Sequence, residues 1–169
     1  METLRDIFNR RFWFLLHVIG APIALALGIF QFLPKLRKAR PHLHRLSGRI
    51  YGIAILLSGV GGLVMSLGIL ADRPVAGLGF GLLAVLWIGV TGFGISAAMR
   101  REFALHQRWM FRSFALTFAA VTLRLQLPFM IMGGMEYVEA ANIVAWTCWV
   151  PNLIFAEWWL RRTRRAIPA

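Results

Sequence analysis

The chain has 169 residues, of which 59% are apolar and only 15% are charged. An ordinary soluble domain is about half apolar and about a quarter charged, so this composition indicates a protein that is dissolved in lipid. The net charge of +12 would suit a nucleic-acid partner, but the long charge-free runs exclude a soluble DNA-binding module, and we expect no nucleic acid to bind. The single cysteine, Cys148, excludes a disulfide-stapled secreted domain.

Several stretches are apolar and long enough to cross a hydrocarbon core, which takes about 20 residues of helix. They predict transmembrane helices over residues 12–34, 46–70, 75–99, 107–132 and 139–160. Because the connections are short, we predict one all-α domain over 1–169, an integral membrane helical bundle with five transmembrane helices. Only the linker 35–43 and the tail from Arg161 are expected to be loop.

Lysine and arginine residues gather on one side of these predicted spans. That side receives Lys35, Arg37, Lys38, Arg40, Arg45, Arg49, Arg100, Arg101, Arg108, Arg112, Arg161, Arg162, Arg164 and Arg165. The other side receives Arg5, Arg10, Arg11 and Arg73. Since loops rich in Lys and Arg stay in the cytoplasm, we expect the N-terminus outside, the C-terminus cytoplasmic, and a location in the inner membrane.

Helical spacing places the small and polar residues of each span on one stripe. The stripes are His17, Gly20, Ala24, Gly28 and Gln31; His44, Gly48, Gly52, Gly59, Gly62 and Ser66; Gly77, Gly81, Ala84 and Gly92; and His106, Met110, Ser113, Thr117, Ala120 and Arg124. Small residues let helices pack closely and polar groups are costly in lipid, so we expect the stripes to face protein.

Two of the histidines on these stripes lie at one depth. His44 and His106 each precede a charge-free run by about 10 Å on the cytoplasmic side. A haem takes two axial ligands at the same level, so His44 and His106 are candidate ligands of a haem iron. Four arginines at this level would pair with the haem propionates, namely Arg45, Arg49, Arg108 and Arg112. The same spacing also fits plain helix packing.

Other polar residues are candidate ligand-binding groups. Arg124 falls near mid-membrane, where burial costs at least a few kcal/mol and calls for an acceptor. Pro151 frees the carbonyl of Thr147 beside Asn152, so Arg124 and Asn152 predict a site for a quinone or an anion, with His17 as a further candidate nearer the outer edge. Two alternatives stay open for Arg124: a carboxylate from another chain, or contacts with Asn152, freed carbonyls or headgroups alone. Glu157 falls near the level of Arg49, Arg112, His44 and His106, and an ion pair there is favoured over a role in proton handling.

Four segments carry a family resemblance. They are His44-Arg45-Leu46-Ser47-Gly48-Arg49-Ile50-Tyr51, His106-Gln107-Arg108-Trp109-Met110, Leu123-Arg124-Leu125 before Pro128, and Cys148-Trp149-Val150-Pro151-Asn152, followed by Glu157. Together they resemble domain-of-unknown-function family 2306, bacterial predicted multi-pass membrane proteins, from about His17 to Glu157. Members usually carry one further N-terminal helix, so the resemblance implies that this chain lacks it, and that either the protein is a shortened member or something else covers that face. It implies a fold but no activity.

A looser resemblance concerns cofactors. The spacing His44-x-x-x-Gly48 is similar to that of b-type di-histidine membrane cytochromes and ferric reductases, which implies haem b. The leading hypothesis is therefore haem- or quinone-linked electron transfer in the membrane. A non-enzymatic integral subunit of a larger membrane complex is the alternative, and a small transporter or lipid-binding protein is the third. No residue is assigned a catalytic role.

Overall fold

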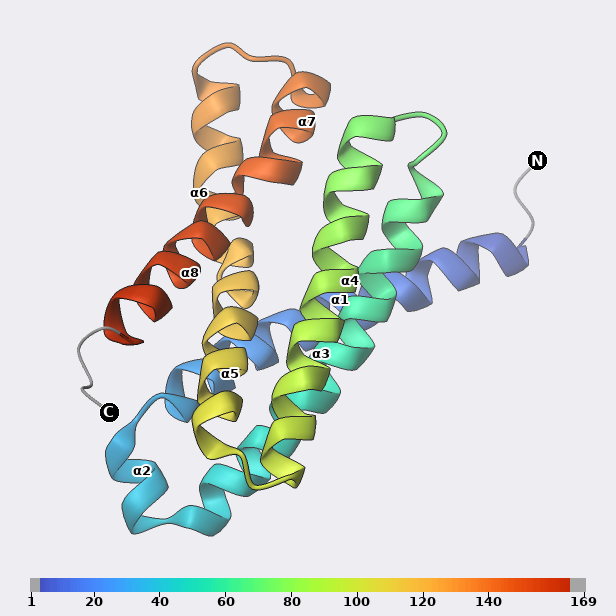
Figure 1. The fold of residues 1–169 in the computed structure, drawn as a ribbon. Helices are drawn as coiled ribbons and strands as arrows, with labels where there is room; N and C mark the ends of the chain where they lie inside the picture. Colours follow the sequence, from blue (N-terminus) through green and yellow to red (C-terminus); the bar gives the residue numbers. More distant parts are fainter. Residues whose placement is uncertain (1–3, 165–169) are drawn as a thin grey trace. The chain divides into compact units, whose positions relative to one another are not determined.

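The computed structural model describes residues 4–164, with side chains from 11 to 163, and Arg165 of the predicted tail lies outside the described residues. Throughout this part of the chain the secondary structure is helical, which confirms the all-α prediction. The chain divides into two compact units, Met1–Ile88 and Gly89–Ala169, which are described in turn (Figure 1). The single five-helix bundle stays a prediction.

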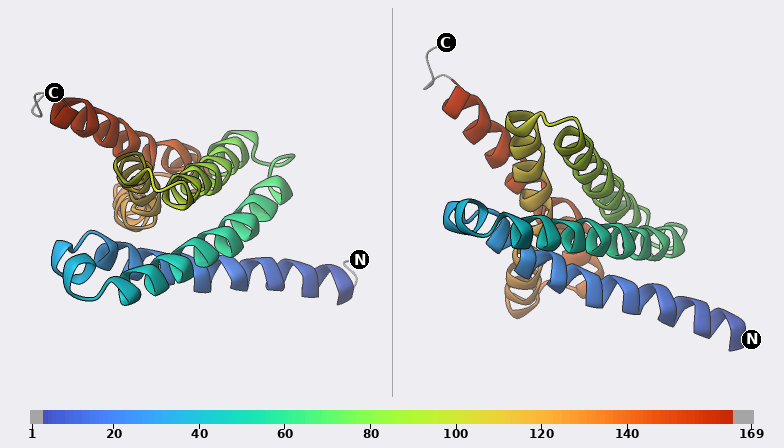
Figure 2. Two further views of the ribbon diagram at one scale, coloured as in Figure 1. Left: turned by 60° about the horizontal axis from the view of Figure 1, so that its bottom comes forward. Right: turned by 90° about the horizontal axis from the view of Figure 1, so that it is seen from below.

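The first unit is built from α1 (Leu4–Gln31), α2 (Pro34–Ala39), α3 (Pro41–Gly68) and the first part of α4 (Pro74–Met99). Helices α1 and α3 lie side by side and run in opposite directions, with α2 forming the corner between them (Figures 1 and 2). Proline stands at the start of α2, α3 and α4, where its fixed φ angle suits a helix and its missing N–H is not needed.

The face of α1 that packs on α3 is the predicted stripe. Gly20, Ala24 and Gly28 are buried, and His17 and Gln31 at its two ends are half-buried. A methyl group added at Gly20 would lie 2.9 Å from the backbone oxygen of Ala54. The two backbones therefore approach too closely for larger side chains, which is the packing that small residues permit in membrane helices.

The second unit holds the rest of α4 with α5 (Phe103–Thr117), α6 (Ala119–Met132), α7 (Tyr137–Thr147) and α8 (Val150–Arg164). Helices α5 and α6 follow one another with an interruption at Phe118. A turn then reverses the chain, so that α7 packs along α6 and α8 packs on α5 (Figure 1).

Segments long and apolar enough to cross a membrane are Arg11–Gln31, Pro41–Gly68, Pro74–Met99 and Phe103–Met132. They correspond to the first four predicted spans. The fifth, 139–160, is divided between α7 and α8, because Pro151 has no N–H to continue the hydrogen-bonding of one long helix. The prediction of a loop over 35–43 is wrong, because Pro34 and Pro41 each begin a helix there.

Two helix ends in the second unit share one capping geometry. After α4 the N–H of Glu102 donates to Ala97 O at 2.9 Å, and Arg101 has a φ of 64°. After α6 the N–H of Met135 donates to Met130 O at 3.1 Å, and Gly134 has a φ of 89°. This left-handed cap suits glycine and strains other residues, so Arg101 occupies a conformation that disfavours its side chain.

Candidate functional site

His106, in the first turns of α5, is held by the neighbouring helix. Its Nδ1 lies 2.7 Å from the backbone oxygen of Gly94 on α4. Because a carbonyl oxygen only accepts, Nδ1 carries the hydrogen and donates it, and in the neutral ring Nε2 bears the lone pair. Glycine at position 94 lets α4 and α5 lie close together here, since a Cβ there would lie 2.8 Å from the sulfur of Met110 on α5.

His17 is held in the same way in the first unit. Its Nδ1 lies 2.9 Å from the backbone oxygen of Ser58 on α3, while the Ser58 hydroxyl donates to the backbone oxygen of His17 at 3.0 Å. Glycine again makes room, because a Cβ at Gly62 would lie 3.0 Å from Nδ1 of His17. The half-buried imidazole of His17 is thus fixed in orientation, with Nε2 on the side away from Ser58.

A hydrogen-bond network joins the end of α1 to the start of α3. The Gln31 side-chain amide donates to Ser47 Oγ at 2.6 Å and to the backbone oxygen of His44 at 3.3 Å. The Ser47 hydroxyl donates in turn to Leu43 O at 2.7 Å. Sequence reasoning gave Ser47 no role, although Gln31 on the α1 stripe at the same end of the hairpin was a signal for a polar partner there.

The predicted haem ligands fall in different units. His44 lies half-buried near the start of α3 in the first unit, whereas His106 belongs to the second. The arginines Arg45 and Arg49, predicted to pair with propionates, are exposed on α3. The pairing of His44 with His106 about one haem stays a prediction.

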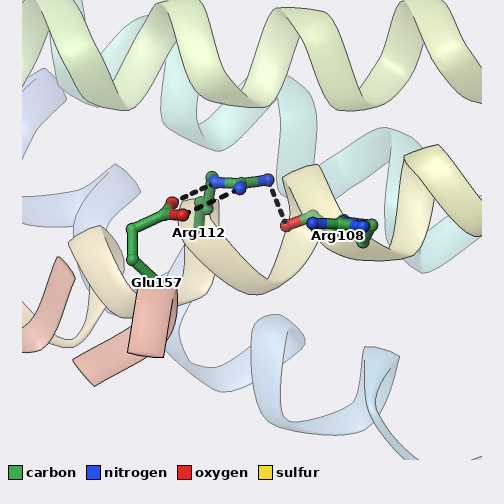
Figure 3. A network of polar contacts seen from close by, with 3 residues as sticks. All are labelled: Arg108, Arg112 and Glu157. Carbon is green, nitrogen blue, oxygen red and sulfur yellow. Dashed lines mark hydrogen bonds and ion pairs between the residues drawn. The ribbon is translucent and has the colours of Figure 1, made fainter. Parts of the chain in front are cut away.

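An ion pair joins α5 to α8 (Figure 3). The Nε and Nη2 of Arg112 both donate to the carboxylate of Glu157, the Nη2 to Oε2 distance being 3.0 Å. The guanidinium also lies 4.8 Å from the ring centroid of Trp109, and its Nη1 donates to Arg108 O at 3.4 Å. This confirms the ion pair predicted for Glu157, so the positive charge of Arg112 is paired with a carboxylate, while Arg108 contributes its backbone oxygen to the network (Figure 3).

A second polar cluster lies where α6 meets α7 and α8. The Asn152 amide donates to Thr122 Oγ1 at 3.0 Å and to Cys148 O at 2.9 Å. The Thr147 hydroxyl donates to Gln126 Oε1 at 2.8 Å, and the Gln126 amide donates back to Thr147 O at 3.4 Å. Gln126 therefore supplies a donor to the carbonyl that Pro151 was predicted to free, a role that its position one turn after Thr122 on the same helix face could have signalled.

Arg124 does not join this cluster. It is exposed, and its Nη1 donates to Ala120 O at 2.8 Å, one turn earlier on its own helix. Two residues along a helix turn the side chain to roughly the opposite face, so Arg124 points away from the face that carries Thr122 and Gln126. Within this chain Arg124 therefore does not contact Asn152, which was one of the alternatives for it, and its role in a ligand site stays a prediction.

A comparison of the sequence with protein families covers most of the helices described above. The profile of DUF2306, a family of predicted membrane proteins, matches residues 14–160. The chain belongs to DUF2306. All the contacts described above lie within the matched segment of this DUF2306 protein, and the family inferred from the sequence motifs is confirmed. No curated protein and no solved structure matches the chain.

In this DUF2306 chain, as described over residues 11–163, no group of three or more His, Cys, Asp or Glu side chains is placed to hold a metal ion. The polar groups instead form separate pairs between neighbouring helices: His17 with Ser58, Gln31 with Ser47, His106 with Gly94, and Arg112 with Glu157. Two of these pairs, His17 with Ser58 and His106 with Gly94, each fix the orientation of an imidazole ring.

Proposed function

We propose that this DUF2306 protein crosses the bacterial inner membrane five times, with its N-terminus outside. The packing of α7 on α6 and of α8 on α5 supports the fifth crossing, because together these helices run back along the whole α5–α6 segment. The contacts of Gln126 with Thr147 support it too, since a backbone carbonyl freed inside the membrane needs a donor from the protein. The cytoplasmic C-terminus rests on the distribution of Lys and Arg.

Within this topology we propose electron transfer through haem b, with His106 as an axial ligand. The observation that carries the proposal is the hydrogen bond from His106 Nδ1 to Gly94 O. Ligating histidines commonly donate their other ring N–H to a carbonyl, which fixes the ring and directs the remaining nitrogen to the metal. When bound, the haem would supply the one-electron Fe(III)/Fe(II) couple.

The remaining parts of this haem proposal rest on the sequence. His44 as the second ligand, with Arg45, Arg49 and Arg108 as partners of the propionates, stays the prediction made from the sequence. Arg112 is left out of the set because Glu157 holds its guanidinium. A quinone held jointly by Arg124 and Asn152 is not favoured, because Asn152 of α8 contacts Thr122 on one face of α6 and Arg124 lies on the other face.

The absorption spectrum of protein purified from haem-replete cells tests this proposal. We expect a Soret band that shifts on reduction, is lost in the variant His106→Leu, and is retained in the control His42→Ala, whose imidazole is exposed. Colourless wild-type protein would refute haem binding. A spectrum unchanged by His106→Leu would refute the assigned ligand.

A second candidate function is that of a non-enzymatic subunit in a larger membrane complex. Arg124 favours it, because an exposed guanidinium on a membrane span is costly unless an anion meets it. The partner would be another membrane protein that contributes a carboxylate at this depth.

Co-purification from membranes in a mild detergent tests this second candidate. We expect a stoichiometric partner that is lost in Arg124→Leu and kept in the control Arg37→Leu, which removes an exposed arginine from α2. A monodisperse single chain, equally stable with Arg124→Leu, would argue against it.

A further inference from the structure

The corner between α1 and α3 carries a dense set of cations. These residues, called the cationic ledge here, are Lys35, Arg37, Lys38, Arg40, Arg45 and Arg49, and all of them are exposed. Residues 34–49 include no Asp or Glu. Among the described residues, no ion pair engages a side chain of the ledge. Their positive charge is therefore left for a partner outside the chain.

The corner is also fixed in place, which separates it from a loose basic tail. The Gln31 amide donates to Ser47 Oγ at 2.6 Å, tying the end of α1 to the start of α3. Helix α2 is held between these two anchored ends and presents Lys35, Arg37 and Lys38 outward. The cations are therefore carried by a helical corner, in which α2 lies between the end of α1 and the start of α3 (Figure 2).

Apolar side chains are exposed next to the same cations. Phe32 and Leu33 precede α2, and Leu46 lies one residue after Arg45 on α3. A free anion would not contact these groups, whereas a lipid offers acyl chains to them and a phosphate to the cations. The combination therefore favours a phospholipid over a soluble phosphate.

We propose that the cationic ledge binds the phosphate headgroups of anionic phospholipids. The apolar part of α1 ends at Gln31, and the charge-free run of α3 begins after Arg49, so the ledge lies at the level where headgroups meet the hydrocarbon. Basic residues next to a membrane span are attracted to anionic lipid in this way, and each contributes to the affinity. The proposal is independent of any haem.

The experiment uses detergent-purified full-length protein and fluorescent phosphatidylglycerol, because in neutral micelles the result does not depend on membrane topology. The ledge variant combines Lys35→Gln, Arg37→Gln, Lys38→Gln and Arg40→Gln. The control variant removes the same charge elsewhere, through Arg100→Gln, Arg101→Gln, Arg161→Gln and Arg162→Gln. Unlabelled phosphatidylglycerol, phosphatidylcholine and inorganic phosphate serve as competitors.

We expect the ledge variant to bind phosphatidylglycerol at least about tenfold more weakly than wild type, and the control to stay within about twofold. Raising the salt concentration should weaken wild-type binding, because the cations are exposed and screened by ions. Phosphatidylcholine and inorganic phosphate should compete poorly.

Equal binding by wild type and ledge variant would overturn the proposal, and so would an equal loss in the control. Competition by inorganic phosphate as effective as that by phosphatidylglycerol would place a soluble anion there instead of a lipid. If circular dichroism shows that the fourfold variant does not fold, the pair Lys35→Gln and Lys38→Gln replaces it, with an expected loss of about threefold.

Discussion

Arg101 and Gly134 occupy the same position in two equivalent helix caps, yet only one of them is glycine. Both have a positive φ, of 64° and 89°. A side chain in this conformation costs roughly 1–2 kcal/mol, because its Cβ comes too close to the neighbouring carbonyl oxygen. The backbone of the turn after α4 is therefore strained, whereas the backbone of the turn after α6 is not.

We expect Arg101→Gly to raise the free energy of unfolding by about 1 kcal/mol and Gly134→Ala to lower it by about as much. Denaturant unfolding of the detergent-solubilised protein measures both. Arg101→Ala is the matched control, because it removes the charge and keeps the strain. If Arg101→Gly stabilises no more than Arg101→Ala, the backbone explanation fails.

The ion pair of Arg112 with Glu157 predicts a coupled loss of stability. The side chains are 15% and 35% exposed, so water screens the pair in part, and we expect Glu157→Gln to cost about 1 kcal/mol. Arg112→Gln should cost somewhat more, since it also removes the contact with Trp109.

A double-mutant cycle measures this coupling by thermal unfolding. We expect the double variant to lose clearly less than the sum of the single losses, because each substitution breaks the same contact. Arg37→Gln, at an exposed position on α2, is the control for a loss of charge alone. Strictly additive losses would show that the two side chains do not interact in solution.

Single residues were predictable from the sequence where a partner of the right chemistry lies at the right depth. Glu157 satisfied this condition, because Arg49 and Arg112 are cations at the same level of the predicted bundle, although depth alone did not decide between them. Arg124 did not, because its stripe was extended through Phe118, where α5 and α6 are interrupted. The hydroxyl of Thr117 donates to Ser113 O just before that point, and such a bond often bends helices. Residues after the interruption then no longer face the side that a straight helix would predict.

At the scale of helices, the contact of α1 with α3 depends on small residues. A methyl group at Gly61 would lie 2.6 Å from the backbone oxygen of Trp13, and no flexible side chain is there to move aside. Gly68, at the end of the same helix, has no atom within 4 Å of an added methyl group.

We therefore expect Gly61→Ala to lower the free energy of unfolding by about 1–3 kcal/mol, since the two helices must shift apart. Gly68→Ala should be neutral or slightly stabilising, because alanine is the better helix former. Thermal unfolding in detergent compares the two variants. Equal effects would mean that the backbones of α1 and α3 are not in close contact.

Hydropathy located the first four spans well because length and apolar composition alone decide which helices can cross a bilayer. It placed the last span less well, since Pro151 divides that segment into α7 and α8. The helical linker was missed because Pro34 and Pro41 each start a helix in a segment whose charges are typical of a loop.

At the scale of the whole molecule, accessible cysteines can establish the topology. The native Cys148 is buried and should contribute little background. Ala71, Ala39 and Thr163 are exposed positions in the α3–α4 turn, in α2 and near the end of α8.

With a membrane-impermeant maleimide on intact spheroplasts, we expect Ala71→Cys to be labelled, and Ala39→Cys and Thr163→Cys to be protected until the membrane is permeabilised. Thr163→Cys decides the number of spans, because α7 and α8 lie between it and the turn after α6. Its labelling together with Ala71→Cys would mean that these helices do not cross. Labelling of Ala39→Cys and Thr163→Cys, with Ala71→Cys protected, would mean that the orientation is inverted.

The family and the membrane setting could be read from the sequence because they rest on composition and on motifs that extend through most of the chain. The activity could not, since apolar spans serve every class of membrane protein alike. His44 and His106 suggested a cofactor because they lie at the same depth in the predicted bundle. Depth gives only the position of a residue along the membrane normal. Whether two residues of different spans meet depends also on the rotation and tilt of their helices.

The hairpin of α1 and α3 has a consequence for how the chain is made. His17 and Gln31, the polar groups that α1 would otherwise present to lipid, find their acceptors and donors in α3. The nascent chain can thus neutralise its first costly groups while the ribosome is still translating the later helices. Insertion should proceed in two stages, with this hairpin leaving the translocon before the helices that follow have emerged.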